Sequence, residues 1–233
     1  MHQHSFVKSD KDGYEVCTDC GTYHSTSPLP PKTLYEDMPY WGDGTGRSTL
    51  EQQISNMTCT DECGISKIDR VMQFVPKRGK NVLEIACAPG ELLNRLLDSN
   101  FQVFGIEPSG RYIDFICKQA PGAYIIQGYF PEVTKTNKGD AFDCIIGLDV
   151  MEHINDYESF LNEIHRLLIP GGVGILMSPI IYEDGLCRST DFIPQEHIWI
   201  FTKKFLQPYL ESKFSKVEFR RWINGHELVI VYK

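Results

Sequence analysis

Residues 82–93, Val-Leu-Glu-Ile-Ala-Cys-Ala-Pro-Gly-Glu-Leu-Leu, decide the fold of this chain. The stretch begins as an apolar run with one acidic residue, Glu84, then breaks into a turn of small residues and restarts as a helical pattern. This order predicts a strand, a tight turn and a helix N-terminus, in which backbone N–H groups face a nucleoside-type ligand. The small residues Ala86, Ala88 and Gly90 would let the backbone approach that ligand closely, and Gly90 can adopt a positive φ.

The turn resembles motif I of the class I S-adenosylmethionine (SAM) dependent methyltransferases, in which an acidic residue precedes a Gly-x-Gly-x-Gly turn. Ala86 and Ala88 stand here in place of two of those glycines. The competing interpretation is a nicotinamide dehydrogenase, whose Gly-x-Gly-x-x-Gly fingerprint would place its third glycine at Glu91. An acidic side chain at a helix start disfavours a bound diphosphate, so the turn favours SAM, whose methionine end is zwitterionic.

Two further strands follow, each with a candidate cofactor residue at its end. Glu107 follows the apolar run 101–106, about 20 positions beyond the turn, where nucleotide-binding βαβ units hold the ribose hydroxyls. The alternative is a solvated carboxylate at the start of the next helix. After the strand at 123–127, the methyltransferase resemblance implies an adenine contact at Tyr129, where many relatives carry an Asp. Tyr129 would stack on the base, or it would be an ordinary core residue.

The apolar run 142–148 predicts a fourth parallel strand, and it ends in the polar cluster Asp149-Val-Met-Glu-His153. Ligands bind at this edge of an open α/β sheet. With the helix that follows, Pro170-Gly-Gly172 and a fifth strand at 173–178, the cluster resembles the ubiquinone-biosynthesis-like branch of the same superfamily. That resemblance implies that Asp149 contacts the cofactor, and it covers residues 66–233.

The expected fold is therefore α/β, a doubly wound Rossmann-like methyltransferase sheet with mostly parallel strands. A closing antiparallel hairpin is predicted from residues 216–220 and 227–232, joined at Asn224-Gly225. We expect three parts: a zinc-binding segment at residues 1–27, a linker with an aromatic lid arm at 28–65, and the methyltransferase domain at 66–233.

The N-terminal segment predicts a small zinc-knuckle appendage. Cys17 and Cys20 are separated by two residues, so both sulfurs can reach one metal ion, and a closed structural site needs four ligands. The best-spaced set is His2, His4, Cys17 and Cys20, with His24 as the reserve ligand. Some small-molecule methyltransferases carry such a segment, and this one resembles a reduced version of it. A disordered tail or a redox pair is the alternative.

The arm ahead of the domain is rich in aromatic residues. Methyltransferases of this superfamily often fold such an arm over the cofactor, and the resemblance makes Tyr35, Tyr40 and Trp41 candidates for a lid that contacts the substrate. Three nearby glycines could supply its flexible joints. The alternative is that these aromatic residues only dock the arm on the core.

Composition limits the partners. The net charge is −8, because Asp and Glu outnumber Lys and Arg by 31 to 23, and this argues against a nucleic-acid partner. No apolar run approaches the roughly 20 residues needed to cross a bilayer, and no signal peptide is visible. Cysteines within strands suit a reducing compartment. We expect a cytoplasmic protein without a membrane partner, and the sequence leaves its oligomeric state open.

The long stretch 179–201 would hold the methyl acceptor, because it is too long for a simple connection in an α/β fold. His197 is the expected general base, since imidazole titrates near neutral pH, and capping or packing is its alternative role. His153 is the rival base, and Arg188 and Tyr182 would contact the substrate.

The expected function is methyl transfer from SAM to a small molecule, most simply O-methylation of a sugar or a biosynthetic intermediate. The contrasting hypothesis is a non-catalytic, zinc-anchored scaffold of the same fold that binds a protein partner. Glu84, Gly90 and Glu107, which a SAM site would use, argue against the scaffold.

Overall fold

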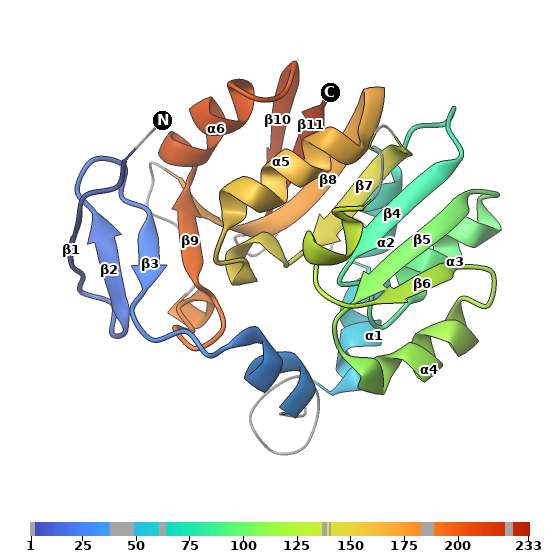
Figure 1. Cartoon of the computed structure of the whole chain (residues 1–233), viewed down its shortest axis with the longest axis horizontal. Coiled ribbons are helices and arrows are strands. Elements are labelled where there is room, and N and C mark those ends of the chain that lie inside the picture. Colours follow the sequence, from blue (N-terminus) through green and yellow to red (C-terminus); the bar gives the residue numbers. More distant parts are fainter. Residues whose placement is uncertain are drawn as a thin grey trace.

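A mostly parallel β-sheet with helices on both faces forms the body of the protein in the computed structural model (Figure 1). The structure describes residues 3–37, 49–60, 64–136, 139, 141–182, 189–221 and 226–233. The strands are β1 (Phe6–Lys8), β2 (Tyr14–Cys17), β3 (Tyr23–Ser25), β4 (Asn81–Ile85), β5 (Gln102–Glu107), β6 (Tyr124–Gln127), β7 (Phe142–Leu148), β8 (Leu168–Ile181), β9 (Trp199–Thr202), β10 (Lys216–Arg221) and β11 (His226–Tyr232).

The helices and short helical turns connect these strands. They are η1 (Thr33–Asp37), α1 (Leu50–Thr58), α2 (Lys67–Met72), α3 (Glu91–Asp98), α4 (Gly110–Gln119), η2 (Glu132–Thr134), η3 (Met151–His153), α5 (Tyr157–Leu167), η4 (Ser189–Asp191) and α6 (Lys203–Glu211). Within the described residues, no helix combines the length and the apolar character that crossing a bilayer requires.

The strand order confirms the predicted doubly wound sheet. Strands β6, β5, β4, β7 and β8 are parallel neighbours, and the hairpin of β10 and β11 closes the sheet because β11 pairs antiparallel with β8. The turn predicted at Asn224-Gly225 lies outside the described residues.

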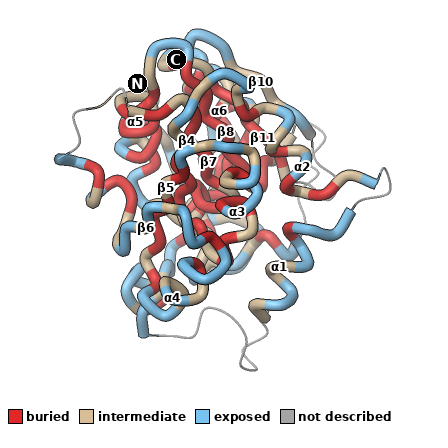
Figure 2. Tube along the Cα trace, turned by 90° about the vertical axis from the view of Figure 1, so that its right-hand side faces the viewer, coloured by how far each residue is buried: buried red, intermediate tan, exposed pale blue. Residues whose placement is uncertain are grey.

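Side chains point alternately to the two faces of the sheet along each strand, and this produces two hydrophobic cores, one on each face. Leu83 and Ile145 belong to the cluster that packs under α5 and α6, whereas Val82 and Cys144 belong to the cluster under α2, α3 and α4. Neighbouring residues of a strand point to opposite faces, so these apolar runs bury both sides of the sheet. Figure 2 shows the central strands as the buried interior of the molecule.

The N-terminal strands continue the sheet. β3 pairs with β9, which in turn pairs with the end of β8 at Ile180 and Ile181 (Figure 1). No strand was predicted here, because most of β9 falls in the stretch 179–201 that was expected to hold the methyl acceptor. The strand is only four residues long, and all four are buried.

Local capping explains where the helices begin. Thr49 and Gln52 form a capping box at α1, and the hydroxyl of Ser66 accepts a hydrogen bond from the backbone N–H of Asp69 at α2. The start of α5 is capped by Asp156, which accepts from Ser159.

Candidate functional site

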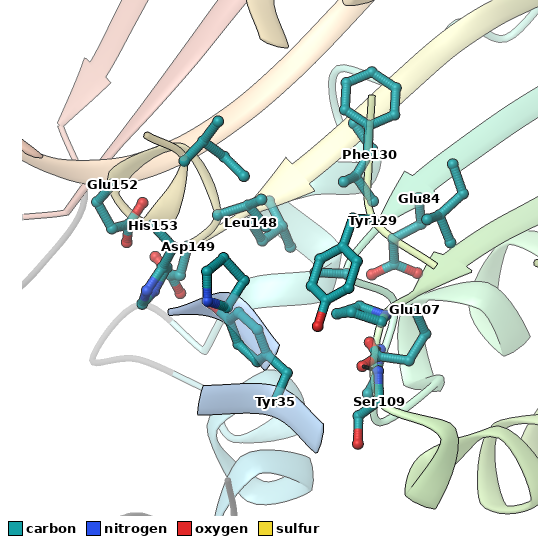
Figure 3. Close-up of a pocket in the computed structure, with 18 of the residues that line it drawn as sticks. Tyr35, Glu84, Glu107, Ser109, Tyr129, Phe130, Leu148, Asp149, Glu152 and His153 are labelled. Atoms are coloured by element: carbon teal, nitrogen blue, oxygen red, sulfur yellow. Dashed lines mark hydrogen bonds between the residues drawn. The ribbon is translucent and has the colours of Figure 1, made fainter. Parts of the chain in front are cut away.

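A cavity of about 670 Å³ opens at the carboxyl ends of β4, β5 and β7. In Figure 3, Glu84 and Glu107 lie on one side of the cavity, and Asp149, Glu152 and His153 lie on the other. The N-terminal arm contributes Pro31, Lys32 and Tyr35 to the lining. This is the edge at which open α/β sheets bind their ligands, and a volume of this size suits a nucleoside-sized molecule.

The turn after β4 provides the floor of the cavity. Ala86 and Ala88 line it, and Ala86 adopts a φ of 56°, a value unusual for a residue with a side chain. Gly90 is absent from the described lining; it stands at the N-cap of α3 with a φ of 104°. A glycine is therefore required at position 90 by the backbone turn, rather than by close contact with the cavity.

Glu107 is buried at the end of β5 and faces the cavity. One carboxylate oxygen accepts a hydrogen bond of 2.9 Å from the N–H of Ser109, and the other accepts one of 3.3 Å from the N–H of Ala88. Burial raises the pKa of Glu107 to about 7, and these two hydrogen bonds oppose the shift. Glu107 thus joins the turn after β4 to the end of β5, where a ribose would be held.

Glu84 adds a second carboxyl group to this side of the cavity, and Glu91, which does not line the cavity, lies close enough to affect Glu84 electrostatically. Glu84 is buried in the cavity wall, and burial followed by the charges of Glu91 and Glu107 raises its pKa well above the usual range. Burial also raises the pKa of Glu91. Each of the two side chains has one buried carboxylate oxygen without a hydrogen-bond partner in the described part of the chain. Such a wall favours a ligand with positive charge and N–H donors.

Tyr129 lies in the cavity wall after β6, where it contacts the N-terminal arm. Its hydroxyl donates a hydrogen bond of 2.8 Å to Glu36, and its ring centroid lies 6.5 Å from that of Tyr35. Tyr35 also lies 6.5 Å from the ring of His153. The arm therefore crosses the cavity between its two ends, as Figure 3 shows for Tyr35.

Asp149 lies at the centre of a cluster of three charged residues, of which the sequence analysis identified only Asp149 itself. The residue adopts a φ of 53°, and its carboxylate lies 2.6 Å from the Lys67 ammonium and 2.8 Å from Nδ1 of His226. Burial alone would raise the pKa of Asp149, but these two cationic neighbours hold it well below the usual range. Burial lowers the pKa of His226, yet Asp149 and Asp191 raise it to about 10. No local pattern marked Lys67 or His226.

Glu152, His153 and His197 come together at the other end of the cavity. One potential ligand atom from each residue lies within 4.8 Å of the other two, and the two imidazole rings are perpendicular. Burial, followed by the charge of Asp149, raises the pKa of Glu152 to about 8, and burial lowers the pKa of His197. The sequence singled out both histidines but did not single out Glu152.

The predicted substrate residues are not all placed. Tyr182 lies beneath the ammonium of Lys203, 4.9 Å from its ring centroid, and it does not line the cavity. Tyr40, Trp41 and Arg188 lie outside the described residues.

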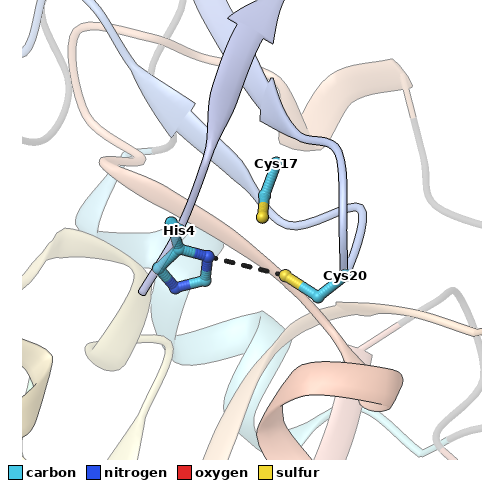
Figure 4. Close-up of side chains that lie close together, drawn as sticks. All are labelled: His4, Cys17 and Cys20. Carbon is cyan, nitrogen blue, oxygen red and sulfur yellow. Dashed lines mark hydrogen bonds between the residues drawn. The ribbon is translucent and has the colours of Figure 1, made fainter. Parts of the chain in front are cut away.

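At the N-terminus, His4, Cys17 and Cys20 point toward one another (Figure 4). Their ligand atoms all lie within 4.8 Å of one another, and the Cys20 sulfur is 3.5 Å from Nδ1 of His4. His2 lies outside the described residues. The reserve ligand His24 is engaged elsewhere, since its Nδ1 contacts Glu15 at 2.9 Å.

Comparison with known proteins gives one family and a consistent fold. A profile described as "Methyltransferase domain" matches residues 62–212. The chain is similar to the ubiquinone biosynthesis O-methyltransferase of Rhizobium etli (strain CIAT 652), with 27% identity over 100 residues, or 42% of this chain and 40% of that relative. The match thus spans about two fifths of the curated relative's length.

Solved structures show the same fold at low identity. An O-methyltransferase family protein from Burkholderia thailandensis superposes with a TM-score of 0.60 at 14% identity, covering 72% of this chain and 55% of the other. The structure of PigF with SAH superposes with a TM-score of 0.55 at 13% identity, covering 70% of this chain and 53% of the other.

Proposed function

The chain belongs to the methyltransferase domain family, and on that premise we propose that it transfers the methyl group of SAM to a small molecule. The observation that carries the proposal is Glu107, which is buried at the end of β5 and bonded to the turn after β4. A carboxylate in this position binds the ribose hydroxyls of a nucleoside cofactor. The relative with SAH bound supports the same cofactor class.

The electrostatics of the cavity suit SAM. The methionine end of SAM carries an ammonium group, and Glu84 in the cavity wall has a buried oxygen that lacks a partner among the described residues. Ala86 and Ala88 would lie against the same end of the cofactor. Tyr129 would stack on the adenine, while Glu36 holds its hydroxyl. Asp149 also lines the cavity and is the remaining proposed cofactor residue; its carboxylate is paired with Lys67 and His226, so it would act together with them.

The proposed acceptor is a hydroxyl of a sugar or a biosynthetic intermediate. Methyl transfer is an in-line displacement, so the protein mainly has to align the acceptor oxygen with the methyl carbon. His197 is the proposed base: it takes the hydroxyl proton as the oxygen bonds to the methyl carbon and the carbon–sulfur bond breaks. Burial favours its neutral form, the form that can accept a proton. His153, whose ring centroid lies 4.8 Å from that of His197, is the rival candidate for the base.

Zinc is the second part of the proposal. His4, Cys17 and Cys20 would supply three ligands of a structural tetrahedral site, and His2 is the candidate for the fourth. The two buried thiols lie at the end of β2 and in the turn that follows, so a bound ion would tie the segment before β1 to that turn.

One experiment tests the function directly. The purified chain is incubated with methyl-labelled SAM and a fraction of small-molecule extract, and the labelled product is identified by mass spectrometry. We expect label in a low-molecular-weight product and conversion of SAM to S-adenosylhomocysteine. A chain that fails to bind S-adenosylhomocysteine in calorimetry would instead support the non-catalytic scaffold.

A further inference from the structure

Glu152, His153 and His197 reach one point of the cavity from two segments that lie far apart in the sequence. The first two residues end η3, and His197 lies just before β9. One ligand atom from each lies within 4.8 Å of the others. We propose that these three side chains bind a divalent transition-metal ion at the end of the cavity opposite Glu107.

The hydrogen bonds of the two histidines prepare them for a metal ion. Nδ1 of His153 lies 2.9 Å from the carbonyl oxygen of Glu196, and Nδ1 of His197 lies 2.7 Å from that of Asp191. A carbonyl oxygen only accepts, so each Nδ1 carries the hydrogen and each neutral ring has its lone pair on Nε2. Metal-binding histidines are oriented in this way, with the second nitrogen donating to a carbonyl or a carboxylate.

Glu152 supplies an independent observation. Its side chain is fully buried, and one carboxylate oxygen accepts a hydrogen bond of 2.9 Å from the hydroxyl of Ser178. The other oxygen is buried and has no hydrogen-bond partner among the described residues. Leaving a buried carboxylate oxygen in this state is unfavourable, and a cation bound beside the two imidazoles would compensate for it.

The backbone holds the two segments together around this point. The N–H of Ile198 donates a hydrogen bond of 2.7 Å to the carbonyl of Glu152, so the segment with His197 is tied to η3. Bonds of about 2.0–2.2 Å to one ion require ligand atoms within about 4 Å of each other, so small side-chain rotations complete the site. Asp149 is not part of it, because Lys67 and His226 occupy its two oxygens.

The donor set indicates which metals fit. Two imidazoles and one carboxylate suit Zn²⁺, Mn²⁺, Co²⁺ or Fe²⁺ better than Ca²⁺, which prefers oxygen ligands alone. Three protein ligands also leave at least one coordination position open. Because all three residues line the cavity, that position faces the space in which a methyl acceptor would lie.

The catalytic role of the ion rests on the proposed function, whereas its binding does not. An acceptor hydroxyl in the open position would lose its proton to water more readily, because the cation lowers its pKa. The oxygen would then bond to the methyl carbon as the carbon–sulfur bond breaks, releasing S-adenosylhomocysteine. In the metal-bound chain, His197 is a ligand and the ion replaces it as the group that activates the hydroxyl.

Cobalt titration tests the site and separates it from the N-terminal cysteines. The full chain is freed of metal with a chelator and titrated with Co²⁺. Thiolate ligands give an intense near-ultraviolet charge-transfer band, whereas a site of imidazole and carboxylate ligands gives only weaker visible bands. We expect a visible component that persists when Cys17→Ser and Cys20→Ser remove the thiolate band.

Matched variants locate that component. Glu152→Gln should weaken its Co²⁺ affinity by at least about tenfold, since the charged ligand is lost. Glu132→Gln removes an exposed carboxyl group from the same cavity and should leave the affinity unchanged. His197→Asn serves as a second ligand variant if Glu152→Gln does not fold, as judged by circular dichroism against the parent chain.

Two results would overturn the site: no thiolate-free component in the full chain, or unchanged Co²⁺ affinity in a folded ligand variant. A chain that binds Co²⁺ as expected but does not bind S-adenosylhomocysteine would support the metal site and contradict the proposed function.

Discussion

The hydroxyl of Tyr14 donates a hydrogen bond of 2.9 Å to the backbone carbonyl of His197, although 183 positions separate the two residues in the sequence. Tyr14 is buried in β2. Nearby, the hydroxyl of Ser25 donates to the carbonyl of Pro194 at 2.6 Å, and its N–H donates to that of Ile198 at 2.8 Å. The N-terminal sheet therefore holds the segment that carries His197.

Tyr14→Phe should lower kcat by about three- to tenfold and leave the affinity for SAM unchanged. The ring and its packing are kept, and the hydrogen bond that positions the His197 backbone is lost. Steady-state kinetics and calorimetry check the two quantities. Thr26→Val is the control, because it removes a hydrogen bond to Gly13 within the same sheet that does not touch His197. Equal losses of kcat in both variants would contradict a positioning role.

Glu107→Ala should weaken the binding of SAM and S-adenosylhomocysteine by at least about tenfold, since the ribose hydroxyls lose a charged acceptor. Calorimetry measures the affinity, and Glu132→Ala provides a control at an exposed position of the same cavity. An unchanged affinity in Glu107→Ala would remove this residue from the cofactor site.

Cofactor affinity should also depend on pH through Glu107. The pKa of its carboxyl is about 7 in the free chain, so a large share is protonated at pH 6. SAM carries a net positive charge and binds better to the ionised form, so its affinity should rise with pH and level off above about pH 8. Calorimetry at pH 6, 7 and 8 follows the trend, and Glu107→Gln should abolish it. Equal pH dependence in the variant would assign the trend to another group.

Replacing Cys17 and Cys20 together by Ser should reduce the zinc content by about one ion per chain, with cofactor binding largely kept. The cysteines lie at the end of β2 and in the turn that follows, and neither lines the cavity. Metal analysis of freshly purified, untagged protein is the measurement, and Cys59→Ser, at an exposed cysteine, is the control. Because the sheet holds the His197 segment, we also expect kcat to fall. An unchanged zinc content would exclude these thiols as ligands.

His197→Ala should lower kcat by about 10²–10⁴ with SAM affinity almost unchanged. If the neutral imidazole is the base, the rate rises with pH through its pKa, which burial places below the usual value of about 6.5. If His197 is instead a metal ligand, the rate follows the metal content of the chain. A flat pH–rate profile with a loss of tenfold or less would exclude both roles and indicate a carboxylate acceptor, which needs no base.

The sequence by itself determined those features of the protein that depend on residues close together in the chain. Alternating or continuous apolar runs define the strands, because side chains of a strand point to fixed faces, and the small residues after β4 define the turn. The position of Glu107 followed from its place directly after β5, and the closing hairpin followed from its strand pattern. For the same reason, His4, Cys17 and Cys20 could be grouped before their geometry was known.

Only the tertiary structure decided which distant residues share a site. β9 is too short to carry a pattern of its own, and its pairing with β3 and β8 joins the N-terminal strands to the sheet. The same pairing brings His197 to Glu152 and His153, as the antiparallel partner of β8 brings His226 to Asp149. Such contacts depend on how the strands pack across the fold. The spacing of residues along the chain does not predict that packing.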